Sequence, residues 1–227
     1  MKIDLHLHTL YGSACAYMDP DQLINQAKLT GLDGVCITEH NQIWDIEAID
    51  RLREKHNFLV IGGVEVSTDL GEILVFGLHQ SVLQVYRAVQ LKAMVDEVDG
   101  VMIMAHPFRA EPELFSRFDL PDPESNGKTQ KKIHRVGNRP IFELIDALEV
   151  YNGRSGINET AFTAAVADHV KLPGTGGSDA HAILGVGACY TIFEETIGDE
   201  RDLINQIKQK RFQGVDDRWQ KDSMARA

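Results

Sequence analysis

The chain has 227 residues, 43% of them apolar and 25% charged, and its formal net charge is −11. This length and composition are typical of one globular domain with a sizeable core, and no apolar run reaches the roughly 18 residues of a membrane span. The acidic charge disfavours binding to long nucleic acids, because proteins that bind them present a basic face. Three scattered cysteines and the lack of a leader-like apolar stretch at the first residues predict a cytoplasmic protein.

Short apolar runs alternate with amphipathic segments along the whole chain. The apolar runs predict strands, which we expect at Ile3–His8, Gly34–Thr38, Phe58–Val66, Glu72–Leu78, Val101–Ala105, Ala147–Tyr151, Leu172–Gly176 and Ala188–Phe193. The amphipathic segments predict helices, which we expect at about Pro20–Gly31, Ile43–His56, Leu83–Val98, Arg139–Asp146, Asn158–His169 and Glu200–Arg211. Asp19 is the expected N-cap of the first helix. The strand at Glu72–Leu78 follows its predecessor too closely for a crossover helix, so we expect a hairpin there.

The alternation of strands and helices predicts a parallel sheet with right-handed crossovers, and about seven such units predict a closed or nearly closed barrel. We expect a single domain over residues 1–227. A polar, proline-rich segment at about 109–140 interrupts the pattern and is expected to be either a disordered insertion or a functional lid. Its basic cluster, Lys128–Lys132, is either a solvated charge run or an attraction for an anionic substrate. The residues after about 212 are expected to form a loose tail.

Histidines and acids gather where the predicted strands end. They stand in five blocks, which contain His6 and His8, Glu39 and His40, Glu65, His106, and Asp179 and His181. The carboxyl ends of parallel barrel strands meet on one face, where active sites are built. Imidazole and carboxylate are ligands of Zn²⁺, Mn²⁺ and Fe²⁺, and about seven of them exceed the needs of one ion. Each block alone is also explained by ordinary strand-end or turn chemistry, but together they predict two or three metals that share a bridging carboxylate.

The blocks also carry a family resemblance. They read DLHLHT, ITEH, GGVEVS, AHPFR and GGSDAH, and in this order and spacing they resemble the motifs of the PHP (polymerase and histidinol phosphatase) superfamily of metal-dependent phosphoesterases. The resemblance extends from Lys2 to about Phe193, as in a stand-alone PHP protein. It implies an α/β fold, namely a distorted seven-stranded (β/α) barrel similar to a TIM barrel. It also implies a multinuclear zinc, manganese or iron site that hydrolyses phosphate esters.

The resemblance implies a role for each matched residue. The matched residues would all be metal ligands: His6, His8 and Asp179 for the first ion, His106 for the second, His40 and His181 for the third, and Glu65 as the bridge. We therefore expect two or three divalent metal ions as cofactors.

Two stretches depart from the family's pattern. Many PHP proteins have an Asp or His shortly after HxHT, whereas this chain reads LYGSACAY, in which only Cys15 could bind a metal. Cys15 is either such a ligand or a small buried apolar residue. After LEVY, where several relatives have a further histidine, this chain has Asn152. The sequence leaves open whether two or three ions bind.

Two arginines follow strand ends on the expected catalytic face. Arg109 and Arg154 would either bind a substrate phosphate bidentately or form salt bridges with the acids of the rim. The expected mechanism is hydrolysis of a phosphate ester by a hydroxide that bridges two metals. In that mechanism Asp179 or His181 would act as a catalytic residue by relaying a proton to the leaving alkoxide.

Two other functions remain open at this point. Amidohydrolases also use a barrel with HxH on its first strand, but they normally need a lysine or a carboxylate at a mid-barrel strand end, and no lysine stands there in this chain. The other alternative is a non-catalytic, metal-binding PHP domain with a regulatory role, although such domains typically lose several ligands. For the enzyme we expect a small phosphorylated substrate, of which a nucleotide is one candidate, and no membrane partner. The sequence specifies neither the ester nor the oligomeric state.

Overall fold

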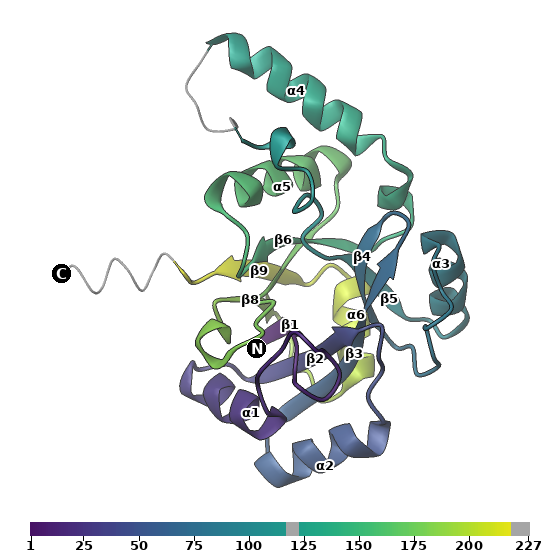
Figure 1. Ribbon diagram of the computed structural model, residues 1–227, viewed down its shortest axis with the longest axis vertical. Helices are drawn as coiled ribbons and strands as arrows, with labels where there is room; N and C mark the ends of the chain where they lie inside the picture. Colours follow the sequence, from purple (N-terminus) through teal and green to yellow (C-terminus); the bar gives the residue numbers. More distant parts are fainter. Residues whose placement is uncertain (117–122, 219–227) are drawn as a thin grey trace, which may run out of the picture.

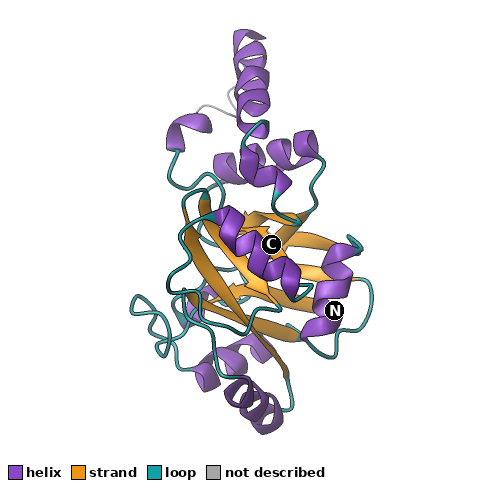
Figure 2. Ribbon diagram, turned by 90° about the vertical axis from the view of Figure 1, so that its right-hand side faces the viewer, coloured by secondary structure: helices purple, strands orange, loops and turns teal. Residues whose placement is uncertain are grey.

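The described part of the chain is built around one nine-stranded sheet that curls into a nearly closed barrel. The structure is a computed structural model and describes residues 1–116 and 123–218. The order of strands in the sheet is β7-β6-β5-β4-β3-β2-β1-β8-β9. Their bounds are β1 (Lys2–Leu7), β2 (Gly34–His40), β3 (Leu59–Thr68), β4 (Gly71–Phe76), β5 (Val101–Met104), β6 (Ala147–Asn152), β7 (Gly174–Gly177), β8 (Cys189–Phe193) and β9 (Phe212–Asp216). Figure 2 shows the strands in the middle of the molecule, with the helices around them.

The expectation of a seven-stranded barrel is wrong, because the sheet of the described residues has nine strands. Two of them, β4 and β8, run against the other seven. The pairs β1–β2, β2–β3, β5–β6 and β6–β7 are parallel. Strand β4 pairs antiparallel with both β3 and β5, which confirms the predicted hairpin. Strand β8 pairs antiparallel with β1 and β9. The fold is therefore an α/β barrel of mixed direction and not a regular TIM barrel.

Strand β9 lies where a loose tail was expected. Its residues Phe212–Asp216 pair antiparallel with β8, and Arg218 donates hydrogen bonds to the backbone oxygens of Gly153 and Ser155. The segment escaped prediction because it is short, contains a glycine and is only partly buried. Residues 212–218 are held in the fold, and the rest of the expected tail, 219–227, lies outside the described residues.

The two ends of the sheet meet at β7. The hydroxyl of Thr191 in β8 accepts a hydrogen bond from the Gly176 amide at 2.9 Å and lies 2.9 Å from the Gly176 carbonyl oxygen. On β9, a Cβ added at Gly214 would lie 2.6 Å from the carbonyl carbon of Thr175. Glycine therefore allows β9 to cross close to β7, and this approach brings the end of β7 beside the end of β1.

Helices cover the outside of the barrel. Their bounds are α1 (Pro20–Leu29), α2 (Ile46–His56), α3 (Ala88–Glu97), α4 (Pro123–Gly137), α5 (Ile157–Val170) and α6 (Glu200–Lys208). The predicted cap is confirmed, because the Asp19 side chain accepts a hydrogen bond from the backbone at the start of α1. The helix expected at Arg139–Asp146 is only a 3₁₀ turn at Pro140–Glu143. Within the described residues, no helix combines the length and the apolarity needed to cross a membrane.

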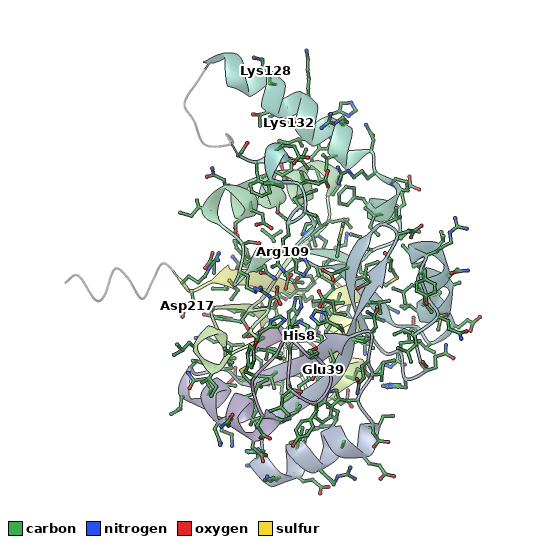
Figure 3. The ribbon with its side chains drawn as sticks, viewed as in Figure 1. His8, Glu39, Arg109, Lys128, Lys132 and Asp217 are labelled. Carbon is green, nitrogen blue, oxygen red and sulfur yellow. The ribbon has the colours of Figure 1, made fainter. Side chains whose placement is uncertain are left out.

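The segment expected to be a disordered insertion or a functional lid contains α4. Figure 1 shows α4 lying along α5, at the end of the molecule farthest from α2. Lys132 on α4 donates to the backbone oxygens of Glu113 and Leu114 at 2.8 and 3.2 Å, which ties the helix to the segment that precedes it. Figure 3 shows Lys128 and Lys132 on α4, well away from His8, which lies where β1 ends. The basic cluster thus belongs to the outer surface of α4.

Apolar side chains fill the beginnings of the strands. One buried cluster joins Ile3 and Leu5 of β1 to Phe76 of β4 and to Leu203 and Ile204 of α6. Burial of this kind contributes about 25 cal/mol per Å² of apolar surface, so it stabilises the base of the barrel. The carboxyl ends of the parallel strands carry polar residues instead, and these residues form the site.

Candidate metal centre

Side chains from β1, β2, β3, β4 and β6, and from the segments after β1, β5 and β7, converge at one end of the barrel. Donor atoms there form four groups that could hold a metal ion, and within each group the donor atoms lie within 4.8 Å of one another. The groups are His8, His40 and His181; His6, His8 and Asp179; His6, His106 and Glu149; and His40, Glu65 and Glu72. The cluster lies near the middle of Figure 3, around His8. The structure thus brings together all seven residues that the sequence predicted as histidine or acidic ligands.

His6 and His8 direct ring nitrogens toward the same point. They are two residues apart, His6 on β1 and His8 directly after it, and their Nε2 atoms lie 3.0 Å from each other. Nδ1 of His6 lies 2.9 Å from Oε1 of Glu149, and Nδ1 of His8 lies 3.1 Å from the Ser13 hydroxyl, which donates to Glu39 at 2.6 Å. Because carboxylate-backed acceptors favour protonation of Nδ1, the Nε2 lone pairs are free to bind a metal.

Glu65 stands between the histidines. Its Oε1 accepts a hydrogen bond from Nε2 of His106 at 2.9 Å. Its Oε2 lies 2.7 Å from Nδ1 of His40 and 3.4 Å from Nε2 of both His6 and His8. This buried oxygen nevertheless makes no hydrogen bond of acceptable geometry with the described residues. A buried carboxylate oxygen surrounded by three imidazole nitrogens, and not hydrogen-bonded to any of them, fits a bridging metal ligand.

Backbone strain is concentrated at two of these residues. His106 has φ of 25° and Asp179 has φ of 51°, values that non-glycine residues rarely adopt. Hydrogen bonds hold both in place: the His106 amide donates to Glu149 at 2.9 Å, and the Asp179 amide donates to the His6 carbonyl at 2.8 Å. Such strain persists where the surrounding structure fixes it, and it is typical of functional sites.

The electrostatics of the cluster favour a cation at its centre. Burial lowers the pKa of His6, but the negative charges of Glu149, Glu65 and Asp179 outweigh this effect and raise it well above its usual value. Burial lowers the pKa of His8 to about 4. Burial raises the pKa of Glu65 and of Asp179, but the positive charge of His6 holds both below their usual values. Without a metal, a proton on His6 supplies the positive charge that this carboxylate-rich cluster requires.

Asn152 connects the cluster to two arginines. Arg109 donates to Oδ1 of Asn152 and to Oδ2 of Asp179, both at 2.7 Å. The backbone amide of Arg154 donates to the same Asn152 oxygen at 2.8 Å, and the Arg154 guanidinium lies 3.9 Å from Oδ1 of Asp179. The Arg109 and Arg154 side chains are 34% and 55% exposed, so a ligand at the mouth of the site can reach them.

Cys15 is the predicted ligand that the structure does not bring into the cluster. It is exposed in the loop after β1, and it belongs to none of the metal-capable groups found in the described chain. It is therefore not the buried apolar residue of the alternative interpretation either. In the same loop, Ser13 contacts His8 instead, a role that a search for metal-ligand residue types does not find.

Sequence reasoning also missed two acidic residues of the site. Glu149 stands in the middle of an apolar strand, where its charge was the available signal, and it is almost fully buried. Glu72 stands at the start of β4, and the antiparallel direction of that strand places it at the same end of the barrel as the ligands. The search was confined to residues at the ends of strands, so it passed over both.

The fold and the cluster together define a class: an α/β barrel with a histidine and carboxylate metal centre at the carboxyl ends of its parallel strands. The chain belongs to the PHP domain family, whose model matches residues 4–135, and a model for the PHP-associated C-terminal region matches residues 159–212. The resemblance read from the sequence motifs is thus confirmed.

Individual relatives agree with this assignment. The uncharacterised protein MJ1587 of Methanocaldococcus jannaschii is 27% identical over 117 residues, which are 48% of this chain and 68% of that protein. PsfC from Pseudomonas syringae superposes with a TM-score of 0.62 at 21% identity, covering 94% of this chain and 90% of its own. A protein of Bifidobacterium adolescentis, provisionally assigned as a metal-dependent phosphoesterase, superposes with a TM-score of 0.55 at 16% identity. The match covers 90% of this chain and 95% of that protein. An amidohydrolase from Chromobacterium violaceum with bound sulfate superposes with a TM-score of 0.52 at 14% identity. The match covers 79% of this chain and 87% of that protein. These three structures share the fold.

Proposed function

We propose that this protein is a hydrolase of phosphate esters that depends on two or three divalent metal ions. The observation that carries the proposal is the position of Arg109 and Arg154, whose guanidinium groups flank Asp179 at the edge of the metal-capable cluster. Guanidinium groups bind phosphate oxygens with fixed geometry, so a phosphate would be held between them and the metal ions. The provisional assignment of the Bifidobacterium protein as a phosphoesterase supports the same choice.

The residues present fit metal ions. The donor set of imidazoles and carboxylates suits zinc, manganese or iron, and the buried Oε2 of Glu65, which accepts no hydrogen bond of acceptable geometry from the described residues, is available as a metal ligand. The residues that would hold the ions are His6, His8, His40, Glu65, His106, Asp179 and His181. When bound, the ions would lower the pKa of a water molecule that acts as nucleophile and would neutralise charge on the phosphate.

The protein's own groups prepare the site for this chemistry. Glu149 fixes the orientation of the His6 imidazole, and the pair of Ser13 and Glu39 fixes that of His8, before a metal arrives. Arg109 would exchange part of its contact with Asp179 for contact with a substrate phosphate. It is a third exposed, so this exchange does not require any rearrangement of the barrel.

When only two ions are bound and His181 holds none, this histidine would deliver the proton to the leaving group. Its Nδ1 lies 3.0 Å from the backbone oxygen of Asp179, to which a protonated Nδ1 can donate, and 3.4 Å from the Arg154 guanidinium. The side chain is 15% exposed, so it can contact a substrate that enters from solvent. Asp179 would act beside it as a metal ligand and as the carboxylate that positions Arg109.

A small phosphorylated molecule is the expected substrate. The chain carries a formal net charge of −11, so the arginines at the site are a local exception on an acidic protein. An acidic surface disfavours a long phosphate backbone but not a compact substrate whose phosphate reaches the arginines. A nucleotide falls within this class.

A substrate screen with defined metals tests the proposal. Protein loaded separately with Mn²⁺, Zn²⁺ and Fe²⁺ is assayed against phosphomonoesters, phosphodiesters and cyclic amides. We expect hydrolysis of an ester, its loss in His6→Ala and in Glu65→Ala, and a raised KM in Arg109→Ala. Each variant is checked for its fold by circular dichroism. Turnover of the cyclic amides alone would instead establish a C–N hydrolase, as the amidohydrolase neighbour allows. Metal binding without any turnover would establish a non-catalytic domain.

A further inference from the structure

Strand β4 brings a carboxylate to the metal centre from an unusual direction. Because β4 runs against its neighbours, its first residues lie at the end of the barrel where the parallel strands finish. Glu72 pairs with Ser67 of β3, and its carbonyl oxygen accepts a hydrogen bond from the Ala105 amide at 2.9 Å. The backbone of Glu72 is thus fixed from both sides, next to the residue that precedes His106.

The Glu72 carboxylate faces the cluster. Its Oε2 lies 3.6 Å from Nε2 of His106, and one of its oxygens lies within 4.8 Å of donor atoms of His40 and Glu65. The Glu72 side chain is 40% exposed, so it stands at the mouth of the site. In the described ranges, no arginine or lysine lies within 4 Å of this carboxylate; apart from His106 its near partner is the Ser67 hydroxyl, at 3.4 Å. The Glu72 carboxylate therefore has no arginine or lysine among the described residues to neutralise it.

Asn152, which stands where several relatives have a further histidine, is not available as a ligand. Oδ1 of Asn152 accepts from Arg109 and from the Arg154 amide, and its Nδ2 lies 2.9 Å from Glu149 and 3.4 Å from Asp179. These contacts occupy both ends of the side-chain amide. An ion held by His40 and Glu65 can instead take a carboxylate oxygen from Glu72, the third member of their group.

We propose that Glu72 is a ligand of a divalent metal ion held together with Glu65 and His40. The proposal rests on the metal centre of the proposed function, although it does not depend on the chemistry of the substrate. It adds to the centre a ligand from an antiparallel strand. Carboxylate oxygen complements imidazole in sites for Mn²⁺, Zn²⁺ and Fe²⁺, and the 40% exposure leaves the ion open to water or substrate.

Metal titration of the full-length protein tests this role. Chelator-treated protein is titrated with Mn²⁺ by isothermal calorimetry for wild type, Glu72→Gln, Glu72→Asp and the control Glu47→Gln. Glu47 lies on α2 with an 86% exposed side chain, so its variant removes the same charge away from the site. Replacement by Co²⁺ adds an absorption spectrum that reports the ligand set of each ion.

A ligand role predicts a selective loss. Changes in outer-shell partners already reduce metal affinity about 10- to 100-fold, so both Glu72 variants should weaken one ion at least tenfold and alter the Co²⁺ spectrum. The remaining ions and the Glu47→Gln isotherm should match wild type. The proposal is overturned if Glu72→Gln binds like Glu47→Gln. It is also overturned if Glu72→Asp binds like wild type, because the charge alone would then explain the effect. Wild-type protein that binds metal through Glu72 but cleaves no ester would refute the proposed function and leave this ligand in place.

Discussion

Oε1 of Glu149 lies 2.9 Å from Nδ1 of His6, whereas the Nε2 of the same ring faces the cluster. The second oxygen of this carboxylate accepts the His106 amide at 2.9 Å. One buried side chain on β6 therefore orients a ligand on β1 and fixes the strained backbone of a ligand after β5. A carboxylate in this position sets the tautomer of the imidazole and raises its basicity as a ligand.

Glu149→Gln should weaken metal binding without unfolding the protein. The amide keeps the size of the side chain but turns one acceptor into a donor, which must face either His6 or the His106 amide. We expect metal affinity to fall about 10- to 100-fold, measured by competition with a chromophoric chelator. The control is Glu47→Gln, whose affinity should remain that of wild type. An unchanged affinity for Glu149→Gln would show that the contact with His6 does not tune the centre.

The parts of the site that the sequence predicted lie at the ends of strands. HxH, ITEH and SDAH are local patterns, and the rule that parallel strands end on one face was enough to place their ligands together. Glu149 was not predicted because it stands inside an apolar strand. Glu72 was not predicted because its position depends on the direction of β4, which a local pattern does not relate to the metal ligands.

The errors in the fold have a similar cause. Strand β9 is a short edge strand whose pairing with β8 is a long-range property, so its residues resembled a tail. Helix α4 has a polar composition and was read as a loop, but Ile133 and Val136 on one face of it are buried in the outer core. Tertiary contact, and not local preference, decides the state of both segments.

The loop after β1 provides a contrast between two small residues. Ser13 is buried and connects His8 to Glu39, whereas Cys15 is exposed. We expect Cys15→Ala to keep the metal content of wild type, measured by plasma mass spectrometry after gel filtration. Ser13→Ala should lower metal affinity about tenfold, because Nδ1 of His8 loses its partner. A drop in metal content in Cys15→Ala would return the thiol to the site.

The ion pair of Glu111 with Arg139 should make a pH-dependent contribution to stability. Its two hydrogen bonds are 2.6 Å long, and they are the main reason that the pKa of Glu111 lies below its usual value. A carboxyl group with a lowered pKa in the folded state stabilises the protein above its unfolded pKa of about 4.3 and loses this effect as the pH falls through the folded pKa.

We therefore expect Glu111→Gln to lower the free energy of unfolding by about 0.5–1 kcal/mol at pH 7, a modest value because both side chains are a third exposed. At about pH 3.5, below the unfolded pKa, the difference from wild type should be smaller. Urea unfolding at the two pH values provides the measurement. Asp168→Asn is the control, since its side chain is 84% exposed and pairs only across one helical turn with Lys171, and it should have almost no effect at either pH. A loss for Glu111→Gln that persists undiminished at low pH would point to packing and not to charge.

Gly12 provides a test of the support behind His8. A Cβ added there would lie 2.4 Å from Cγ and 2.8 Å from Cδ of Glu39, a distance that real Cβ atoms do not show. Glu39 cannot move aside freely, because it accepts hydrogen bonds from the Thr9 amide at 3.1 Å, from Ser13 at 2.6 Å and from the Trp44 indole at 3.1 Å. Gly12→Ala should therefore destabilise the protein by about 1–3 kcal/mol.

Gly127→Ala should have the opposite effect. Gly127 lies in α4, and a Cβ there meets no atom within 4 Å, so alanine should raise stability by about 0.5–1 kcal/mol through helix preference alone. Thermal unfolding of the two metal-free variants measures both stability changes, the expected decrease in Gly12→Ala and the expected increase in Gly127→Ala. A chelator competition on the same samples measures their metal affinity. Because displacement of Glu39 also moves Ser13 away from His8, metal affinity should fall in Gly12→Ala and stay constant in Gly127→Ala. Equal metal affinity in the two variants would show that Glu39 supports the fold of the loop without orienting the histidine.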